Sequence, residues 1–563
     1  MNEGIFRKKT LRHIEKEVAE GQSDGHATSM QKVLTVRDLT FMGIAAIVGA
    51  GIFSTIGKAS FDGGPGIILL FLFVSVACGF SAICYAEFAS MVPVSGSAYT
   101  YSYVAFGEVI AWIIGWDLLM EYAIGNIAVA ISWSSYFTSL INSIKIGGVQ
   151  LHIPEYLATD YWTAKYGLSD AARLAWANAP VIGGIRFICN IPAFIITAII
   201  TWIIYIGIKE SRRSTNVMVI LKIAIILLVM VAGCFYVDTA NWTPFLPNGI
   251  GGVLAGTSAV FFSYIGFDAI STTAEECRNP QRDLPRAMFL SLIICTVVYI
   301  LVALVLTGMT SYKNLDVGDP LAYVFSTMNS KWANWIAGVI SISAVIATAS
   351  VLLVFQLGQP RIWMSMSRDG LLPPVFARIH PKYKTPSFST ILTGLIVGIP
   401  ALFMNLSVVV DLTSVGTLFA FVLVCGGILR LQNHPQRLQS KFKTPYVNSK
   451  WITPALLILS AVLLGLYYPG GYKAALGMDG DWEHIRTRIP FWLFGIVFTI
   501  TAVLSFLRNY SLIPVLGFLC CTYLLCESGV SNWERFLIWL VIGLVVYFLY
   551  GAKHSKLLKE EKL

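Results

Sequence analysis

The feature that most constrains the fold is a series of apolar segments, each about as long as a membrane-crossing helix. These segments recur from about residue 39 to about residue 551. About 20 apolar residues are needed to cross about 30 Å of hydrocarbon, and backbone groups in lipid must be satisfied internally. The alternating apolar and polar pattern of a membrane barrel is absent. Only 13% of the residues are charged, too few to cover the surface of a soluble domain. The sequence therefore predicts an all-α membrane protein.

The predicted spans and the basic residues between them set the topology. We predict about fourteen spans, and an even number places both ends of the chain on one side of the membrane. With the ends inside, most of the 40 lysines and arginines fall in the tails and inner loops, which fits the positive-inside rule. We therefore expect a multi-pass protein of the plasma membrane (the cell inner membrane if the source is bacterial) with both termini in the cytoplasm. The predicted spans are 39–57, 66–91, 108–142, 189–208, 215–237, 250–276, 287–309, 333–360, 387–404, 408–430, 451–468, 489–507, 511–526 and 534–551.

The segments outside the spans carry little chemistry. Residues 1–38 are polar and lack an apolar signal core, so they are predicted to be a cytoplasmic tail, as are residues 552–563. The outer loop from about 143 to 188 has a short amphipathic stretch near 169–178 and is expected to cap the outer face. The net charge of +9 does not indicate nucleic-acid binding, because the basic residues do not form one stripe. Metal-ligand spacings, nucleophile elbows and phosphate loops are absent from the sequence, so we expect no enzyme activity, metal or cofactor.

Two of the spans are interrupted by glycines at comparable places. The first contains Gly49 and Gly51, and the sixth contains Gly266 shortly before Asp268. Glycine in a helix interior costs roughly 1 kcal/mol relative to alanine. In the first span alone, close helix packing explains the glycines equally well. A second interruption five spans later favours a binding site, because paired broken helices line the site in many transporters.

The two interruptions also divide the chain into repeats. Spans 1–5 (39–237) and spans 6–10 (238–431) are predicted to be inverted repeats, since an odd number of helices reverses the direction of the second half. Residues 432–551 hold four accessory spans, 11–14. These spans could mediate a homodimer, bind a small membrane subunit or only pad the core, and the sequence does not choose among the three.

A broken helix offers a specific kind of chemistry. The break leaves amide N–H groups free at the start of one half and carbonyls free at the end of the other. The amides suit a carboxylate and the carbonyls suit an ammonium group, because of the direction of the helix dipole. The pair of breaks is therefore predicted to recognise the groups that every α-amino acid shares.

Four groups of residues around these breaks resemble a known family. The chain is similar to the amino acid–polyamine–organocation (APC) superfamily and, within it, to cationic amino acid transporter-like permeases. The matching residues are Val48 to Phe53; Glu87 to Pro93 with Gly96, Ser97 and Tyr99; Phe262 to Asp268 and Glu275 to Asp283; and Gly358 to Arg361 with Ser367 to Pro373. The resemblance implies a LeuT-like fold with five-plus-five inverted repeats, a substrate held between spans 1, 3, 6, 8 and 10, and alternating access.

The resemblance also implies which residues bind the substrate. The carboxylate would lie on amides at the first break, and the amino group would face carbonyls of both breaks. The implied backbone set is Ile47, Gly49, Ala50, Gly51, Phe262, Ser263 and Ile265. Phe262 is the implied aromatic gate over the substrate. In span 8, Phe355 adds bulk beside the substrate side chain and no acid, which favours neutral over cationic substrates, although the family name points the other way.

Lys222 is the one lysine within a predicted span. An ionisable group in the membrane is costly and usually functional. It lies nine residues beyond Arg213, about 13 Å along a helix, so its amine could instead snorkel to the inner interface. In several relatives a lysine at this position replaces a sodium ion. That resemblance implies that Lys222 couples transport to protons.

Two acidic residues are candidates for a gate or for support of the site. Glu121 lies within span 3 beside the expected site, where it could contact the substrate or brace the broken helices. Asp268 continues span 6 towards the inner surface, where it is either part of an inner gate or part of a solvated helix end.

The resulting functional prediction is a secondary active transporter that imports L-amino acids, with protons as the coupled ion. An amino acid or polyamine exchanger remains an alternative. A channel or sensor without coupled transport is disfavoured, because the polar residues within the spans cluster at one depth instead of lining a continuous path.

Overall fold

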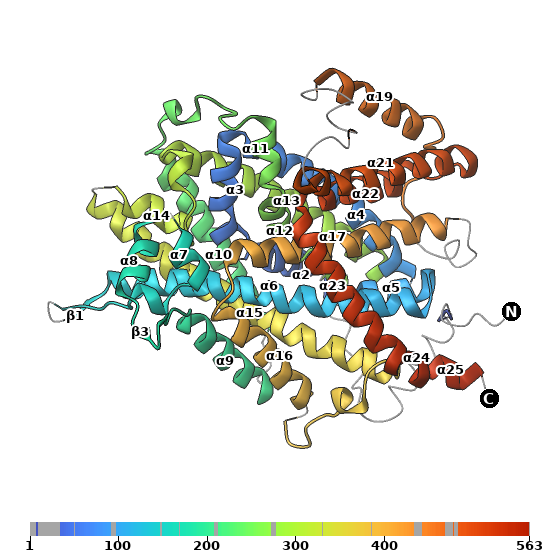
Figure 1. The fold of residues 1–563 in the computed structure, drawn as a ribbon, viewed down its shortest axis with the longest axis horizontal. Helices are drawn as coiled ribbons and strands as arrows, with labels where there is room; N and C mark the ends of the chain where they lie inside the picture. The colour runs from blue at the N-terminus through green and yellow to red at the C-terminus, as the bar shows by residue number, and fades with distance from the viewer. Residues whose placement is uncertain are drawn as a thin grey trace.

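The computed structural model describes residues 7–9, 34–49, 51–91, 97–146, 149–167, 169–207, 212–268, 270–271, 277–328, 330–383, 385–432, 442–467, 477 and 482–561. Most of these residues are helical. The long helices run roughly along the long axis of the molecule, and the long helix α6 (Glu108–Ser143) lies near the centre of the bundle (Figure 1). The fold is therefore mostly α, as the sequence predicts.

Helices form in each of the predicted apolar segments. The helices from Val36 to Arg430 are α2 (Val36–Ile47), α3 (Ile56–Gly63), α4 (Ile67–Met91), α5 (Ser97–Ala105), α6, α9 (Ile191–Tyr205), α10 (Arg212–Cys234), α11 (Gly249–Ala255), α12 (Thr257–Phe262), α13 (Pro280–Met309), α14 (Pro320–Ser326), α15 (Lys331–Arg368), α16 (Ser387–Ala401) and α17 (Leu406–Arg430). Of these, α5 and α14 lie between predicted spans. The C-terminal part has α19 (Ile452–Tyr467), α21 (Trp482–Arg508), α22 (Leu512–Glu527), α23 (Val530–Val546), α24 (Ala552–His554) and α25 (Lys556–Glu561). Short turns of tighter or wider helix are η2 (Gly51–Thr55), η3 (Gly64–Gly66), η5 (Thr239–Trp242), η7 (Tyr312–Asn314), η8 (Pro374–Ala377) and η9 (Tyr547–Gly551).

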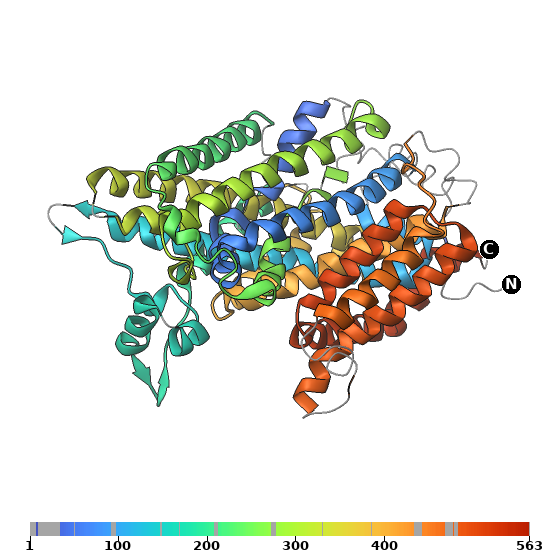
Figure 2. The ribbon, with the colours of Figure 1, turned by 90° about the horizontal axis from the view of Figure 1, so that it is seen from above.

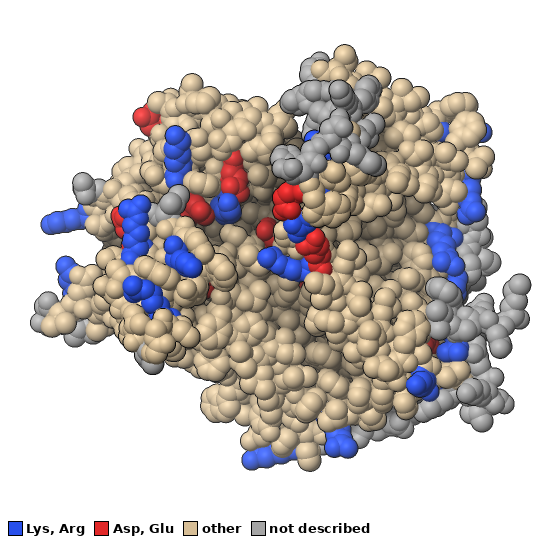
Figure 3. Space-filling model, in the orientation of Figure 1, with Lys and Arg blue, Asp and Glu red and all other residues tan. Residues whose placement is uncertain are grey.

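The length and the apolar surface of these helices suit a membrane. In the described part of the chain, eight helical segments are long and apolar enough to cross a bilayer, and four further apolar helices are shorter. Charged side chains gather towards the ends of the long axis and near the junction of α21 and α23, with broad uncharged areas elsewhere on this face (Figure 3). On α4, Leu69, Leu72, Phe73 and Val76 recur at helical spacing and are 38–53% exposed, as lipid-facing side chains are. These features describe a multi-pass membrane protein, while the count of fourteen crossings and the repeat symmetry stay predictions.

The first predicted span is interrupted in its middle. Helix α2 ends at Ile47, Val48 leaves the helical conformation with ψ 86°, and the widened turn η2 begins at Gly51 before α3 continues. The last turn of α2 and the first turn of η2 therefore face each other across a short non-helical link. The predicted break in this span is confirmed.

The sixth predicted span is interrupted in the same way. Helix α12 is only six residues long and ends at Phe262. The following residues form turns, and Gly266 has a φ of +114°, a conformation that L side chains rarely adopt. The next described helix, α13, begins at Pro280. The predicted break in this span is confirmed as well.

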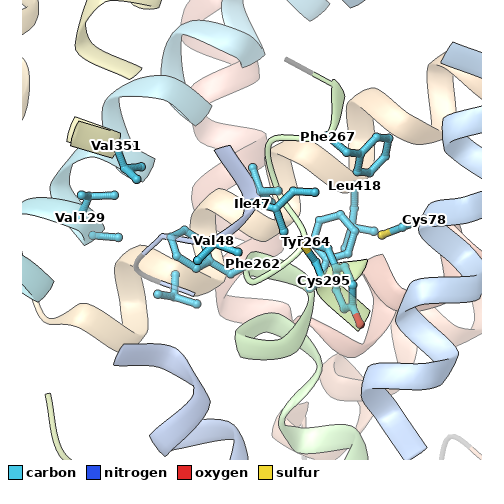
Figure 4. Packing of buried hydrophobic residues seen from close by; sticks show 14 of the residues in the cluster. Ile47, Val48, Cys78, Val129, Phe262, Tyr264, Phe267, Cys295, Val351 and Leu418 are labelled. Atoms are coloured by element: carbon cyan, nitrogen blue, oxygen red, sulfur yellow. The ribbon is translucent and has the colours of Figure 1, made fainter. Parts of the chain in front are cut away.

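The two breaks pack directly against each other. A Cβ added to Gly51 would lie 2.5 Å from the backbone Cα of Ser263, and a Cβ added to Gly266 would lie 3.0 Å from the backbone carbonyl carbon of Ala46. Each glycine therefore lets the backbone of the other broken helix approach closely. In Figure 4, Ile47 and Val48 of the first break lie beside Phe262 of the second.

A small outer segment stands apart from the bundle (Figure 2). It contains the hairpin β1 (Lys145–Ile146) with β2 (Val149–Gln150), then η4 (Glu155–Leu157), α7 (Tyr161–Tyr166), α8 (Asp170–Asn178) and the hairpin β3 (Val181–Ile182) with β4 (Ile185–Arg186). Both helices have side-chain caps, from Asp160 and Ser169. Helix α8 matches the short helix predicted near 169–178, and the segment has a small core of its own.

Residues from near both ends of the chain meet at the opposite end of the bundle. The Lys9 amine pairs with the Asp369 carboxylate at 2.7 Å, and the backbone of Lys556 donates to the Asp369 carbonyl at 3.1 Å. Close by, the buried Glu108 carboxylate accepts hydrogen bonds from Tyr547 and Ser555. The described residues 7–9 and 555–556 therefore lie on one side of the bundle.

The glycine contact between the breaks generates a prediction about stability. Gly51→Ala and Gly266→Ala should each lower the unfolding temperature in detergent by several degrees, because the added Cβ overlaps backbone or demands a strained φ, at a cost of about 1–3 kcal/mol. The matched control is Gly79→Ala in α4, whose Cβ would meet nothing within 4 Å. Equal unfolding temperatures for all three variants, measured by tryptophan fluorescence, would contradict the close approach.

Candidate functional site

A cavity lies between the two broken helices in the middle of the bundle. Five predicted spans contribute to its wall, those numbered 1, 3, 6, 8 and 10, which are the spans that the resemblance implies. The lining residues are Ala46, Ile47, Gly49 and Gly51; Glu121, Gly125 and Val129; Phe262 and Ile265; Val351 and Phe355; and Thr413.

Most of the predicted substrate-binding residues meet at this cavity. Ile47, Gly49, Gly51, Phe262, Ile265 and Phe355 all line it. Ser263 does not, because its hydroxyl turns back to the Ala259 carbonyl at 3.0 Å and to Thr55 at 3.2 Å. Ala50 lies outside the described residues. The structure therefore brings the predicted set together around one space, with Ser263 supporting the wall from behind.

The backbone at the cavity has the polarity that the sequence predicts. Helices α2 and α12 end at the breaks, at Ile47 and Phe262, where the Ile47 carbonyl accepts from the Tyr299 hydroxyl at 2.9 Å and the Phe262 carbonyl accepts from the Ile265 amide at 3.2 Å. The turn η2 starts at Gly51 on the other side of the first break and directs its first amides back towards the link. Carbonyl ends attract a cation and amide ends attract an anion.

The side-chain wall opposite the breaks is mainly apolar. Val129 of α6 and Val351 of α15 lie together on one side of the close-up view, across from Val48 and Phe262 (Figure 4). Phe355 packs edge-on against Tyr122, with ring centroids 5.6 Å apart. Gly125 leaves room in this wall, since a Cβ there would meet only Thr413, at 3.8 Å. The sequence predicted Phe355 but not Val129, Val351, Gly125 or Thr413, which look like ordinary residues of apolar helices.

Glu121 is the one acidic residue in the cavity wall, among the residues described. It is 3% exposed, and its Oε2 atom has no hydrogen-bond partner within the described chain. Asp117 lies one turn away on the same helix and is also buried. Asp268 is buried too but does not line the cavity. Of the two predicted gate or support residues, Glu121 is therefore placed at the site and Asp268 is placed behind it.

Lys222 reaches the first broken helix. Its side chain is 1% exposed, and Nζ donates a hydrogen bond to the Ala45 carbonyl at 3.1 Å. That carbonyl belongs to the last turn of α2, where the helix dipole favours a positive charge. The amine therefore points into the bundle, and the snorkelling alternative does not describe its position.

Tyr299 of α13 is a site residue that the sequence did not reveal. Its hydroxyl lies 2.9 Å from the Ile47 carbonyl oxygen and 2.8 Å from the Ser263 carbonyl oxygen. It therefore bridges the two breaks. In the sequence it is one tyrosine within an apolar run, and no local pattern distinguishes it from a residue that faces lipid or core.

A polar cluster lies beside the first broken helix, where it meets the loop before α14. The Ser54 hydroxyl lies 2.5 Å from that of Ser132 and donates to the Gly318 carbonyl at 2.8 Å. The Tyr136 hydroxyl donates to the Phe53 carbonyl. The loop before α14 is thereby tied to the first broken helix and to α6.

With the geometry established, comparisons with known proteins identify the family. The amino acid permease family profile matches residues 34–503, and the profile for the C-terminus of such permeases matches residues 510–555. The chain belongs to the amino acid permease family. This membership within the APC superfamily is what the sequence motifs predicted.

Full-length relatives have several different substrates in their names. The methylthioribose transporter of Bacillus subtilis (strain 168) is 37% identical over 99% of both chains. The branched-chain amino acid permease BcaP of the same organism is 36% identical over 99% of this chain and 100% of the relative. The vacuolar cationic amino acid transporter 2 of Arabidopsis thaliana is 32% identical over 97% of this chain and 93% of the relative. Membership in this transporter family implies a transport function, not catalysis.

The residues that the structure describes contain no cluster of three or more histidine, cysteine, aspartate or glutamate side chains that could hold a metal ion. The polar groups at the cavity are instead backbone amides and carbonyls, hydroxyls and one carboxyl group. Such groups bind small organic ions through hydrogen bonds.

The Asp319 carboxyl, in the loop before α14, generates a prediction about pH. Burial raises the pKa of the half-buried Asp319, at the start of α14, to about 6, and a hydrogen bond with Ser139 offsets part of this shift. The native protein therefore keeps this proton between about pH 4 and pH 6, where the unfolded chain loses it, so this carboxyl reduces stability as pH rises through that range. The unfolding temperature of Asp319→Asn should exceed that of the wild type by a few degrees at pH 7.5. At pH 4 the two unfolding temperatures should be about equal.

The control for this measurement is Asp170→Asn, whose side chain is 95% exposed. Its unfolding temperature should follow that of the wild type at every pH. If Asp319→Asn also follows the wild type between pH 4 and pH 7.5, Asp319 is not a buried acid in the folded protein.

Proposed function

We propose that the chain is a secondary active transporter that imports L-amino acids with neutral side chains by alternating access. The observation that carries this proposal is the cavity between the two broken helices. Its backbone ends suit the carboxylate and ammonium groups of an amino acid. Membership in the amino acid permease family supports the same substrate class.

The apolar part of the wall supports a neutral side chain. Val129, Val351 and Phe355 surround the space beyond the breaks, and hydrophobic walls favour apolar groups of matching size. One of the full-length relatives is a branched-chain amino acid permease. A cationic side chain would have Glu121 as its one charged partner among the described lining residues, and Phe355 would restrict its length.

Protons are the proposed coupled ion, with Lys222 as the proton-binding group. The charged amine stabilises the end of α2 through the Ala45 carbonyl, and its deprotonation would release this end of the helix. A change of protonation would therefore be linked to movement of the first broken helix. Exchange of one amino acid for another is the alternative, in which Lys222 stays charged throughout.

The remaining predictions about the whole chain belong to the same proposal. Residues 39–237 and 238–431 are assigned to two inverted repeats, and residues 432–551 to accessory spans that could contact a second copy or a small membrane subunit. Both termini are assigned to the cytoplasm of a plasma-membrane protein. A channel or sensor is disfavoured because transporters of the amino acid permease family share the matched profile and because broken helices around a central cavity are typical of transporters.

Uptake into proteoliposomes tests the function and the coupling together. A panel of labelled amino acids, with methylthioribose as a non-amino-acid control, would be offered with and without an inward proton gradient. Neutral amino acids should accumulate only with the gradient. Lys222→Ala should abolish this accumulation while leaving exchange of internal for external substrate measurable. Accumulation that requires internal amino acid instead of a gradient, or an unchanged gradient effect in Lys222→Ala, would contradict proton symport.

The cavity wall gives a separate prediction about side-chain size. Gly125→Ala places one methyl group in the cavity at ordinary contact distance from Thr413, so the variant should fold normally. Its KM for leucine or isoleucine should rise by about tenfold or more, while that for alanine should change little, since one methyl in a tight pocket changes affinity by about 1–3 kcal/mol. Gly338→Ala in α15, which has open space around it, is the control. Equal effects on alanine and leucine would place Gly125 outside the side-chain pocket.

A further inference from the structure

Tyr299 occupies a central position between the two breaks. It lies in the middle of α13, a helix that contributes no residue to the wall of the cavity, and it is fully buried. Its hydroxyl reaches the Ile47 carbonyl at 2.9 Å and the Ser263 carbonyl at 2.8 Å. These carbonyls belong to the ends of α2 and α12, which are far apart in the sequence.

The Tyr299 hydroxyl has fewer hydrogens to donate than there are carbonyl oxygens next to it. A phenol has one hydrogen to donate, whereas two carbonyl oxygens lie within bonding distance. It can therefore donate fully to one carbonyl at a time or share its hydrogen weakly between both. The carbonyl oxygen that does not receive the Tyr299 hydrogen can accept a hydrogen bond from another donor.

The ring of Tyr299 is held firmly by its neighbours. It packs against Phe71 with ring centroids 5.7 Å apart and against Tyr264 with centroids 5.5 Å apart. The Tyr264 hydroxyl in turn donates to the Phe71 carbonyl at 3.0 Å. The position of the Tyr299 hydroxyl is therefore set by packing from α4 and α13 and by the turn after α12, independently of any bound molecule.

We infer that Tyr299 is a positioning residue for the substrate's ammonium group. Its hydroxyl holds the Ile47 carbonyl, whose residue lines the cavity, close to the Ser263 carbonyl behind it, so that an ammonium group in the cavity meets this pair from the Ile47 side. An ammonium group has three hydrogens. One of them can donate to the carbonyl oxygen that the single phenol hydrogen does not occupy. When the ammonium group takes one carbonyl, the hydroxyl donates to the other. This inference rests on the proposed amino acid substrate.

The test compares two ligands that differ only in the ammonium group. L-Leucine and 4-methylpentanoate, which is leucine without its amino group, would be measured on wild type and Tyr299→Phe in detergent by competition binding and by thermal shift. The loss of one buried hydrogen bond should weaken leucine binding by about tenfold. Binding of 4-methylpentanoate should change less than about twofold, because it has no ammonium group to position. The ratio of leucine affinity to 4-methylpentanoate affinity should therefore be much lower in Tyr299→Phe than in the wild type.

Tyr264→Phe is the matched control, because Tyr264 belongs to the same aromatic cluster and bonds a carbonyl outside the breaks. It should retain the wild-type preference for leucine. An unchanged preference in Tyr299→Phe, or equal weakening of both ligands, would overturn the inference. Failure of the wild type to bind leucine would instead overturn the proposed function.

A second measurement covers the case in which Tyr299→Phe does not fold. A difluorotyrosine placed at position 299 alone keeps the ring and the hydroxyl but makes the hydroxyl a stronger donor. The ratio of leucine to 4-methylpentanoate affinity should then differ at least about twofold from that of the wild type, since the carbonyls are shared differently. A ratio equal to that of the wild type would also overturn the inference.

Discussion

The contact between the two broken helices is the constraint on which the rest of the site depends. Gly51 lies against Ser263 and Gly266 lies against Ala46, so each break is held open by the backbone of the other. A side chain at either glycine would separate them. Because the helices stop where they meet, backbone groups of both breaks lie beside one small space. Tyr299 then joins the two carbonyl ends from behind, and Lys222 binds the last turn of α2 from a third direction. The cavity, its polarity and its proposed coupling to protons all follow from this one arrangement.

The site divides recognition between backbone and side chains. The breaks supply groups that suit any α-amino acid, whereas Val129, Val351, Phe355 and Gly125 shape the space for the part that varies. Such a division would explain how one family can include relatives named for branched-chain and for cationic amino acids. Changes in the wall would alter the preferred substrate without disturbing the glycine contact that builds the fold.

The parts of this structure that were predictable from sequence are those with a local signal. Apolar length indicates helices in a membrane, and glycines within apolar runs indicate breaks, so the spans and both interruptions could be placed. The wall of the cavity could be assigned to spans but only partly to residues. Val129, Val351 and Thr413 have the same local pattern as lipid-facing or core positions, and only the packing of α6, α15 and α17 selects them. Ser263 shows the converse, because its hydroxyl could turn into the cavity or back to its own helix, and only the neighbouring Thr55 and Ala259 decide between these. Tyr299 lies in the seventh span, whereas the predicted site lies between spans 1, 3, 6, 8 and 10.

The central claim is that the two breaks bind both charged groups of an amino acid, the carboxylate and the ammonium group. Equilibrium competition against labelled leucine on the purified wild-type protein tests this claim most directly. The competitors are leucinamide, which lacks the carboxylate; 4-methylpentanoate, which lacks the amino group; and methylthioribose, which lacks both. The account predicts that unlabelled leucine competes and that each of the other three competes at least about a hundredfold more weakly, since each loses one or both charge-assisted interactions. Comparable competition by leucine and any of the three would contradict it.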